Sequence, residues 1–181
     1  MKLTRKRPGH SQAIVIALAG AVATTLSGCS GEEAKHSYTV PGTVCGAAVN
    51  AAELSSFLPP GEHISIKKSN PVTGSSQCDL LVDGHLGARI TVEWWKSGTT
   101  TYDFAQGQTL ADLDHSTEKG RYLYSRTQAF GKVEGCRNAA HKDELLFTAI
   151  QPNEPKHEDA DAMKKLITSY TRAVGNSREC R

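Results

Sequence analysis

The sequence predicts a single α+β domain in which two helices pack on one face of an antiparallel sheet of about five or six strands. Three observations favour this fold class. Residues 86–96 alternate apolar and polar side chains, as a strand with one buried face does. Residues 158–174 place apolar side chains at helical spacing. A shorter helical pattern begins near residue 50, and helices separated in this way usually cover one face of an antiparallel sheet.

Residues 1–28 have the layout of a secretory signal peptide. A cationic start from Lys2 to Arg7 precedes an apolar stretch of 14 residues, 13–26. A helix that crosses a bilayer needs about 20 apolar residues, so this stretch favours a signal peptide over a transmembrane helix.

The apolar stretch ends in Leu26-Ser27-Gly28-Cys29, which resembles the lipobox of bacterial lipoproteins at all four positions. In that family the cysteine thiol receives a diacylglyceryl group, and the chain is cleaved just before the cysteine. The resemblance implies that Cys29 anchors the mature protein at the extracytoplasmic face of the cell membrane, because two acyl chains anchor stably. Residues 29–44 have few apolar side chains and no period, so we expect a flexible tether ahead of a domain spanning 45–181.

Asn50 is the predicted start of the first helix. Glu53 stands three residues later, where its side chain is expected to bond back to the cap in a capping box. Leu54, Phe57 and Leu58 then fall on one face, and Pro59-Pro60-Gly61 ends the helix. Two turns are marginal alone, so burial of these side chains must stabilise the helix.

Strand patterns follow in several short segments, and residues 145–150 are apolar on both faces, which predicts a central strand. Residues 63–67 are one of these predicted strands, in which we expect Ile64 and Ile66 to face inward. Residues 102–118 are ambiguous, with Leu110 and Leu113 fitting one helical turn. The other predicted strands are 78–82, 86–96, 122–124, 128–133 and 137–140.

The strands 78–82 and 86–96 form a predicted hairpin. Asp-Gly usually makes a two-residue turn, but that register would place Asp79 on the core face, because a one-residue slip flips every side chain. We therefore predict a three-residue loop, 82–84, with Leu80 opposite Leu86 and Cys78 opposite Ala88.

The final helix is predicted over 158–174, ending at Gly175-Asn176. His157, Glu158, Asp159 and Asp161 at its start could supply metal ligands. Acidic residues also suit the positive end of a helix dipole, so we expect no metal there. The apolar stripe consists of Met163, Leu166, Ile167, Tyr170 and Val174.

Four cysteines remain beside Cys29, and an even number in an exported chain favours disulfides. Zinc sites usually use close pairs such as C-x2-C, whereas the nearest two here are 33 positions apart. Of the three possible connectivities we predict Cys45 with Cys78, because Cys45 precedes the first helix and Cys78 lies on the core face. We pair Cys136 with Cys180, because Cys180 follows the last helix and can return to a strand.

Charge excludes nucleic acid as a partner. The 181 residues are 38% hydrophobic and 22% charged, which is ordinary for one globular domain. Four of the 21 Lys and Arg residues lie in the signal peptide, which leaves 17 against 19 Asp and Glu, or −2. A slightly acidic body without a basic stripe cannot neutralise a phosphate backbone.

The sequence contains no Gly-x-Ser-x-Gly, His-Glu-x-x-His or phosphate-binding glycine motif. We therefore expect no catalytic residues and no cofactor, but a non-catalytic binding or assembly module of the cell envelope. An envelope enzyme with an active site outside these motifs is the alternative. Trp95 lies on the outer strand face with Glu93 and Arg89, where it is either exposed or covered by a loop, and large aromatic side chains are more often covered. If it is exposed, the aromatic side chain and the adjacent charge pair are suited to recognising an envelope protein or a small ligand. A surface position predicts that Trp95→Ala weakens binding and leaves the melting temperature nearly unchanged.

Beyond the lipobox, the chain resembles small actinobacterial cell-envelope lipoproteins. The local pattern is Cys45-Gly46, then Ala51-Ala52-Glu53-Leu54 and Phe57-Leu58, then Cys78 opening a strand. Where that family often has an aromatic residue shortly after the second cysteine, this chain has Asp79 and Leu80. The resemblance implies a location in the envelope rather than a particular activity.

Overall fold

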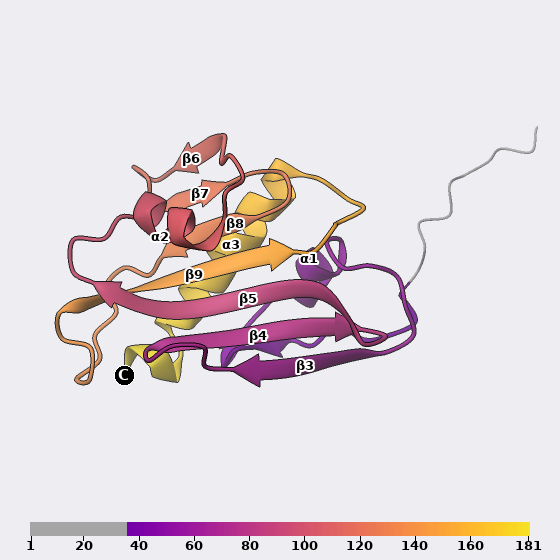
Figure 1. The fold of residues 1–181 in the computed structure, drawn as a ribbon, viewed down its shortest axis with the longest axis horizontal. Helices are drawn as coiled ribbons and strands as arrows, with labels where there is room; N and C mark the ends of the chain where they lie inside the picture. The colour runs from indigo at the N-terminus through magenta and orange to yellow at the C-terminus, as the bar shows by residue number, and fades with distance from the viewer. Residues whose placement is uncertain (1–35) are drawn as a thin grey trace, which may run out of the picture. The chain divides into compact units, whose positions relative to one another are not determined.

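Two antiparallel meanders meet along one seam to form a seven-stranded sheet (Figure 1). The computed structural model describes residues 36–181, so the predictions for the signal peptide and Cys29 lie outside the described residues. The sheet order is β3-β4-β5-β9-β8-β7-β6, and the seam is the β5–β9 pair. The strands are β1 (Thr43–Val44), β2 (Ala47–Ala48), β3 (Ile64–Ser69), β4 (Ser75–Val82), β5 (His85–Lys96), β6 (His115–Thr117), β7 (Tyr122–Tyr124), β8 (Ala129–Lys132) and β9 (Glu144–Pro152).

The α+β class is confirmed, with β9 in the centre of the sheet as predicted. The sheet has seven strands rather than five or six, and β1 and β2 form a separate small hairpin. The helices are α1 (Ala51–Ser55), α2 (Thr101–Gln108) and α3 (Ala160–Gly175), followed by the 3-10 helix η1 (Arg178–Cys180).

The two predicted helices, α1 and α3, do share one face of the sheet, within one hydrophobic cluster. Helix α2 covers the other face, in front of the sheet in Figure 1, over a second cluster that contains Phe104, Phe130 and Phe147. It occupies part of the segment that the sequence leaves ambiguous. Leu110 and Leu113, which fit one helical turn in the sequence, lie beyond the end of α2 at Gln108, and Leu110 is 98% exposed.

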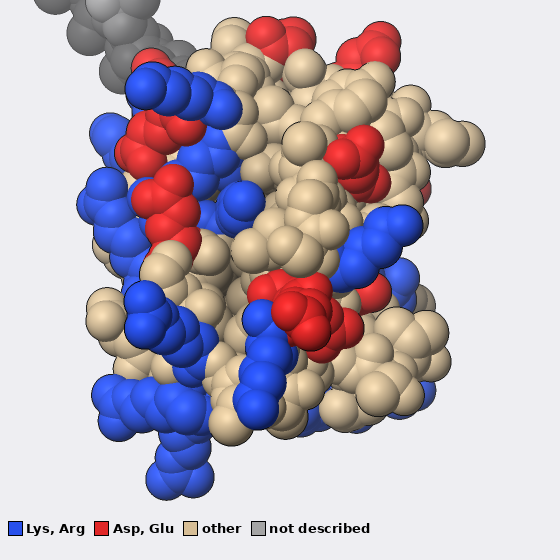
Figure 2. Space-filling view, turned by 90° about the vertical axis from the view of Figure 1, so that its left-hand side faces the viewer, with Lys and Arg blue, Asp and Glu red and all other residues tan. Residues whose placement is uncertain are grey.

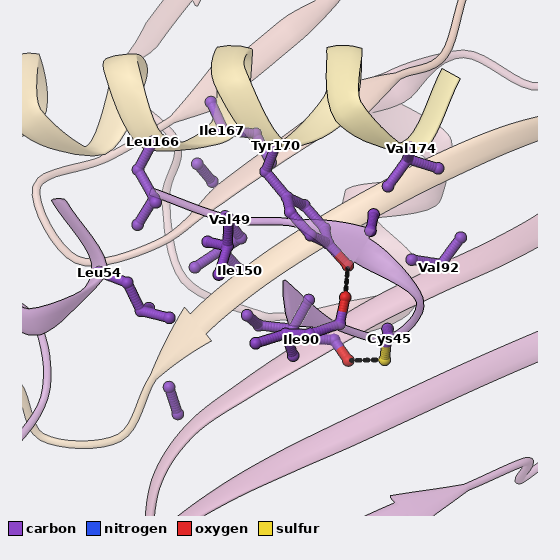
Figure 3. Packing of buried hydrophobic residues seen from close by; sticks show 14 of the residues in the cluster. Cys45, Val49, Leu54, Ile90, Val92, Ile150, Leu166, Ile167, Tyr170 and Val174 are labelled. Atoms are coloured by element: carbon purple, nitrogen blue, oxygen red, sulfur yellow. Dashed lines mark hydrogen bonds between the residues drawn. The ribbon is translucent and has the colours of Figure 1, made fainter. Parts of the chain in front are cut away.

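Helix α3 supplies the apolar stripe that its sequence predicts. Met163, Leu166, Ile167, Tyr170 and Val174 are all fully buried against the sheet and the N-terminal hairpin (Figure 3). The Tyr170 hydroxyl donates to the carbonyl of Val44 at 3.1 Å, and burial raises the pKa of this phenol. A paired hydroxyl can be buried at little cost, so this bond fixes the hairpin against α3.

Residues 36–44, which the sequence assigns to a flexible tether, pack against the domain. Val40 and Val44 are 9% and 1% exposed, and Thr43–Val44 pairs with Ala47–Ala48 as a hairpin. Cys45 and Gly46 form its turn with φ of 47° and 78°. The folded part therefore begins before Cys45, because two valines provide apolar anchors in a segment of low average hydrophobicity.

The predicted three-residue loop between β4 and β5 is wrong. Asp83 and Gly84 form a two-residue turn, with φ of 49° and 83°. A β-bulge then shifts the register between Leu80 and Leu81, and Gly87 is the extra residue. A Cβ at Gly87 would lie 3.0 Å from Pro59, which explains the glycine. The observed pairs beyond the bulge are Leu80–Ala88 and Cys78–Ile90. The bulge therefore keeps the apolar side chains of β4 and β5 on the same face of the sheet.

Three smaller predictions are also wrong. Residues 137–140 form a loop that ends in a turn, in which the Asn138 side chain accepts from the amide of Ala140. Ile66 is 41% exposed, because β3 is an edge strand. Asn50 caps α1 as predicted, but the Glu53 carboxylate accepts from the hydroxyl of Ser169 on α3. Glu53 thus ties α1 to α3.

Both predicted disulfides are confirmed. Cys45 pairs with Cys78, which ties the N-terminal hairpin to β4, and Cys136 pairs with Cys180, which ties η1 to the loop after β8. Residues 33–181 form one compact unit that contains both bonds and both hydrophobic clusters. This unit therefore holds the contacts that it needs to fold.

Candidate ligand-binding groove

A groove of about 960 Å³ lies where three segments distant in the sequence come together. This volume is at the upper end of the range for small-molecule sites, which is about 300–1,000 Å³. The segments are the N-terminal stretch, α1 with the turn that follows it, and the connection from β9 to α3, at the right of Figure 1. The described lining residues are His36, Tyr38, Thr39, Val40, Ala51, Ser55, Ser56, Leu58, Pro60, Lys156 and His157.

The first wall is held by hydrogen bonds to the turn after α1. The Tyr38 hydroxyl donates to the carbonyl of Pro59 at 2.6 Å, and the amide of Ser37 donates to Gly61 at 3.0 Å. Burial raises the pKa of the Tyr38 phenol, and the nearby Asp83 carboxylate raises it further. Tyr38 is therefore a neutral, fixed aromatic wall.

The floor of the groove is apolar. Leu58 and Val40 are 5% and 9% exposed, and Ala51 and Pro60 continue the surface that they form. The sequence predicts Leu58 as part of the first helix, but α1 ends at Ser55 and Leu58 lies in the turn that follows, so this turn supplies one side of the floor. An apolar floor favours a ligand with an apolar part.

The opposite wall carries positive charge. Lys156 and His157 are exposed, and the His157 ring lies 6.0 Å from that of Phe57. None of the described lining residues is Asp or Glu. Of the carboxylates that follow this wall in sequence, Glu158 pairs with Arg126 at 2.9 Å. Asp159 accepts from the amide of Ala162 to cap α3, and its carboxylate also lies 3.7 Å from His157 Nε2.

A second hollow, of about 420 Å³, surrounds the loop before β9 and includes Arg137, His141 and Lys142. Figure 2 looks at the end of the sheet where β5 ends and β9 begins, and Lys and Arg side chains dominate its left part with Asp and Glu among them. The two hollows lie at opposite ends of β9. We place the candidate site in the first, which is larger and has a continuous apolar floor.

The predicted recognition residues Trp95, Arg89 and Glu93 do share the sheet face opposite α3, but they do not form an open site. The Trp95 ring meets Phe104 of α2 edge to face at 5.6 Å, and a Cβ at Gly107 would lie 2.9 Å from the indole. Arg89 pairs with Asp79 at 2.8 Å. Trp95 thus packs between α2 and the sheet and is partly exposed. Of the two predicted alternatives the covered one holds, and the cover is helix α2 rather than a loop.

Glu93 is a partly buried carboxylate beneath α2. Gln108 Nε2 donates to it at 3.2 Å, while Trp95 Nε1 and Ser75 Oγ lie nearby outside hydrogen-bond geometry. Burial raises the pKa of the Glu93 carboxyl, and these polar neighbours offset part of the rise. The ionised form is therefore less favourable in the folded protein than in the unfolded chain.

We expect Glu93→Gln to raise the melting temperature at pH 7. Because the pKa of Glu93 is higher in the folded than in the unfolded protein, the free energy of unfolding falls as pH rises through the unfolded and then the folded pKa. The neutral amide of Gln does not titrate, so the variant does not lose this stability. The gain should shrink towards pH 4, where the native carboxyl is protonated. Melting curves at both pH values, with the exposed Glu62→Gln as control, test this. An equal gain at both pH values would contradict it.

Helix-start geometry accounts for the acidic residues near position 159, and residues 36–181 contain no group of three or more His, Cys, Asp or Glu arranged to hold a metal ion. Within the same residues, every helix is too short or too polar to cross a membrane. Comparisons with protein-family models, curated proteins and solved structures found no match for the chain.

Proposed function

We propose that this chain is a lipoprotein, anchored through Cys29 to the extracytoplasmic face of the cell membrane, whose domain binds an apolar ligand in the groove without catalysis. The observation that carries the proposal is the apolar groove itself, one wall of which is the N-terminal segment 36–40. Its partners are thus the membrane, through the anchor, and a ligand that reaches the groove.

The position of the groove supports a link between anchor and ligand. His36 stands seven residues after Cys29 in the sequence. Seven residues span at most about 25 Å, even when fully extended. The groove wall therefore lies within about 25 Å of the predicted site of acylation, close enough to the bilayer for exchange of an apolar ligand with it.

The lining favours binding over covalent chemistry. Ser55 and Ser56 donate their hydroxyl groups to carbonyls of α1, at 2.9 and 2.8 Å. A nucleophilic serine instead needs its hydroxyl paired with a base. These serines therefore supply a polar rim to an apolar floor, which is the usual composition of a binding pocket.

The anchor is tested by Cys29→Ser. We expect this change to abolish incorporation of a labelled fatty acid and to leave uncleaved precursor, because the thiolate is the atom that is alkylated. Ser27→Ala keeps a small residue in the lipobox and should retain labelling. Fatty-acid labelling and mass spectrometry of the membrane fraction measure both. Labelling that persists in Cys29→Ser would overturn the anchoring proposal.

The groove is tested with residues 33–181 and Nile red, an uncharged apolar dye. Ser56 is exposed and lines the groove, so Ser56→Trp should fill it and abolish the rise in dye fluorescence. Ala52 is also exposed on α1 but lies outside the described lining, so Ala52→Trp should bind the dye as the wild type does. Equal loss in both variants, or no binding by the wild type, would contradict the groove as the site.

A further inference from the structure

We infer that the ligand of the groove is an amphiphile, with an acyl chain on the apolar floor and an anionic headgroup at the rim formed by Lys156 and His157. This inference rests on the proposed function, because it specifies the ligand of the same groove. The headgroup can be the carboxylate of a free fatty acid or the phosphate of a membrane lipid.

The charge of the lining supports an anion. Lys156 contributes a full positive charge, and no described lining residue is Asp or Glu. The one carboxylate paired with this wall is that of Asp159, 3.7 Å from His157 Nε2, and among the ion pairs of the described residues none involves Lys156. This contrasts with the chain as a whole, since residues 29–181 carry slightly more acidic than basic side chains. A local cationic site on a weakly acidic domain selects anions by charge complementarity.

The arrangement of polar and apolar parts also fits an amphiphile. The apolar floor of Leu58, Val40 and Ala51 belongs to one side of the groove, whereas Lys156 and His157 come from the connection between β9 and α3. A ligand that contacts both needs an apolar chain next to a charged group. A purely polar ligand would leave the floor unfilled, and a hydrocarbon would leave Lys156 without a counter-ion in the groove.

The location of the groove makes such ligands available. The groove wall lies within about 25 Å of the predicted acylation site, so the surrounding bilayer is the nearest source of acyl chains. Membrane lipids and fatty acids carry the same chemistry of chain and anion, and they differ only in the headgroup. The experiment below separates the two sources.

The test uses displacement of Nile red from residues 33–181 by three competitors with matched oleoyl chains. These are oleate, lysophosphatidylglycerol with a net negative headgroup, and lysophosphatidylcholine with a net neutral one, each below its critical micelle concentration. We expect at least one anionic competitor to displace the dye at lower concentration than lysophosphatidylcholine does. Preference for lysophosphatidylglycerol assigns the lipid as source, preference for oleate assigns the fatty acid, and equal displacement by both supports recognition of chain and charge alone.

Lys156→Gln supplies the residue-level test. This change should raise the concentration of each anionic competitor that displaces the dye about two- to fivefold, the range expected for loss of one partly exposed ion pair. The concentration of lysophosphatidylcholine that displaces the dye should stay the same. Lys165→Gln removes an exposed lysine of α3 outside the described lining and should change neither. Lys156 is exposed, so its loss should not affect folding. Equal displacement by all three competitors in the wild type, or no effect of Lys156→Gln, overturns the inference, while dye binding that is blocked by Ser56→Trp would leave the proposed function intact.

Discussion

Replacing Cys45 and Cys78 together with alanine should lower the free energy of unfolding by about 4 kcal/mol or more. The chain-entropy model assigns about 4 kcal/mol to a loop of this size. Both cysteines are also buried, at 5% and 1% exposure, so the change removes packed sulfur atoms as well as the cross-link. The bond holds the N-terminal hairpin on β4, and the first wall of the groove continues from that hairpin.

The second disulfide provides the matched control. Cys136 and Cys180 close a loop of similar length, with a sequence separation of 44 against 33, so the entropic contribution is nearly the same. Both residues are partly exposed. Replacing Cys136 and Cys180 together with alanine should therefore lower the free energy of unfolding by less than replacing Cys45 and Cys78 does. Urea unfolding followed by tryptophan fluorescence measures the difference. A larger decrease in the free energy of unfolding when Cys136 and Cys180 are replaced would contradict the greater contribution of the buried Cys45–Cys78 bond.

Trp95→Ala should lower the free energy of unfolding by about 2–3 kcal/mol, at or just below the low end of the range for buried large aromatic side chains, because Trp95 is partly exposed. The expectation reverses the one drawn from the sequence. The indole packs on Phe104 and on Gly107 of α2, and its loss opens a cavity between that helix and the sheet. The melting temperature should fall by several degrees.

Tyr102→Ala is the control for this experiment. Tyr102 belongs to the same helix but is 60% exposed, so its truncation should leave the melting temperature within about one degree of the wild type. Thermal unfolding of both variants by circular dichroism measures the contrast. If the two variants melt alike, Trp95 does not join α2 to the sheet.

The elements best predicted from sequence are those with a long, unbroken period. Helix α3 repeats its apolar spacing from Met163 to Val174, and β5 alternates from Ala88 to Trp95, beyond the bulge, so each pattern fits one structure only. Helix α2 has eight residues and a weak apolar face, and its stability comes from Phe104 inside the second cluster. The capping box of Thr100 and Asp103 was the available signal for it.

Tertiary contacts decide the features that the sequence analysis missed. The Asp83-Gly84 turn follows its local preference, and the resulting mismatch of faces is corrected by the bulge at Gly87, which no periodicity indicates. The groove is built from residues 36–40, 51–60 and 156–157, which no linear motif connects. Two of the lining residues were singled out from the sequence, Leu58 as an apolar helix residue and His157 as a weak candidate metal ligand. That both line one groove depends on the packing of α1 beside the start of α3.

The central claim is that one chain is both acylated at Cys29 and loaded with an amphiphile in its groove. Native mass spectrometry of the full-length protein extracted from membranes tests it most directly. The account predicts an N-terminal diacylglyceryl cysteine and a bound acyl anion in the wild type and in Ala52→Trp, with the bound anion lost in Ser56→Trp. A wild-type protein that carries no more bound acyl anion than Ser56→Trp would contradict it.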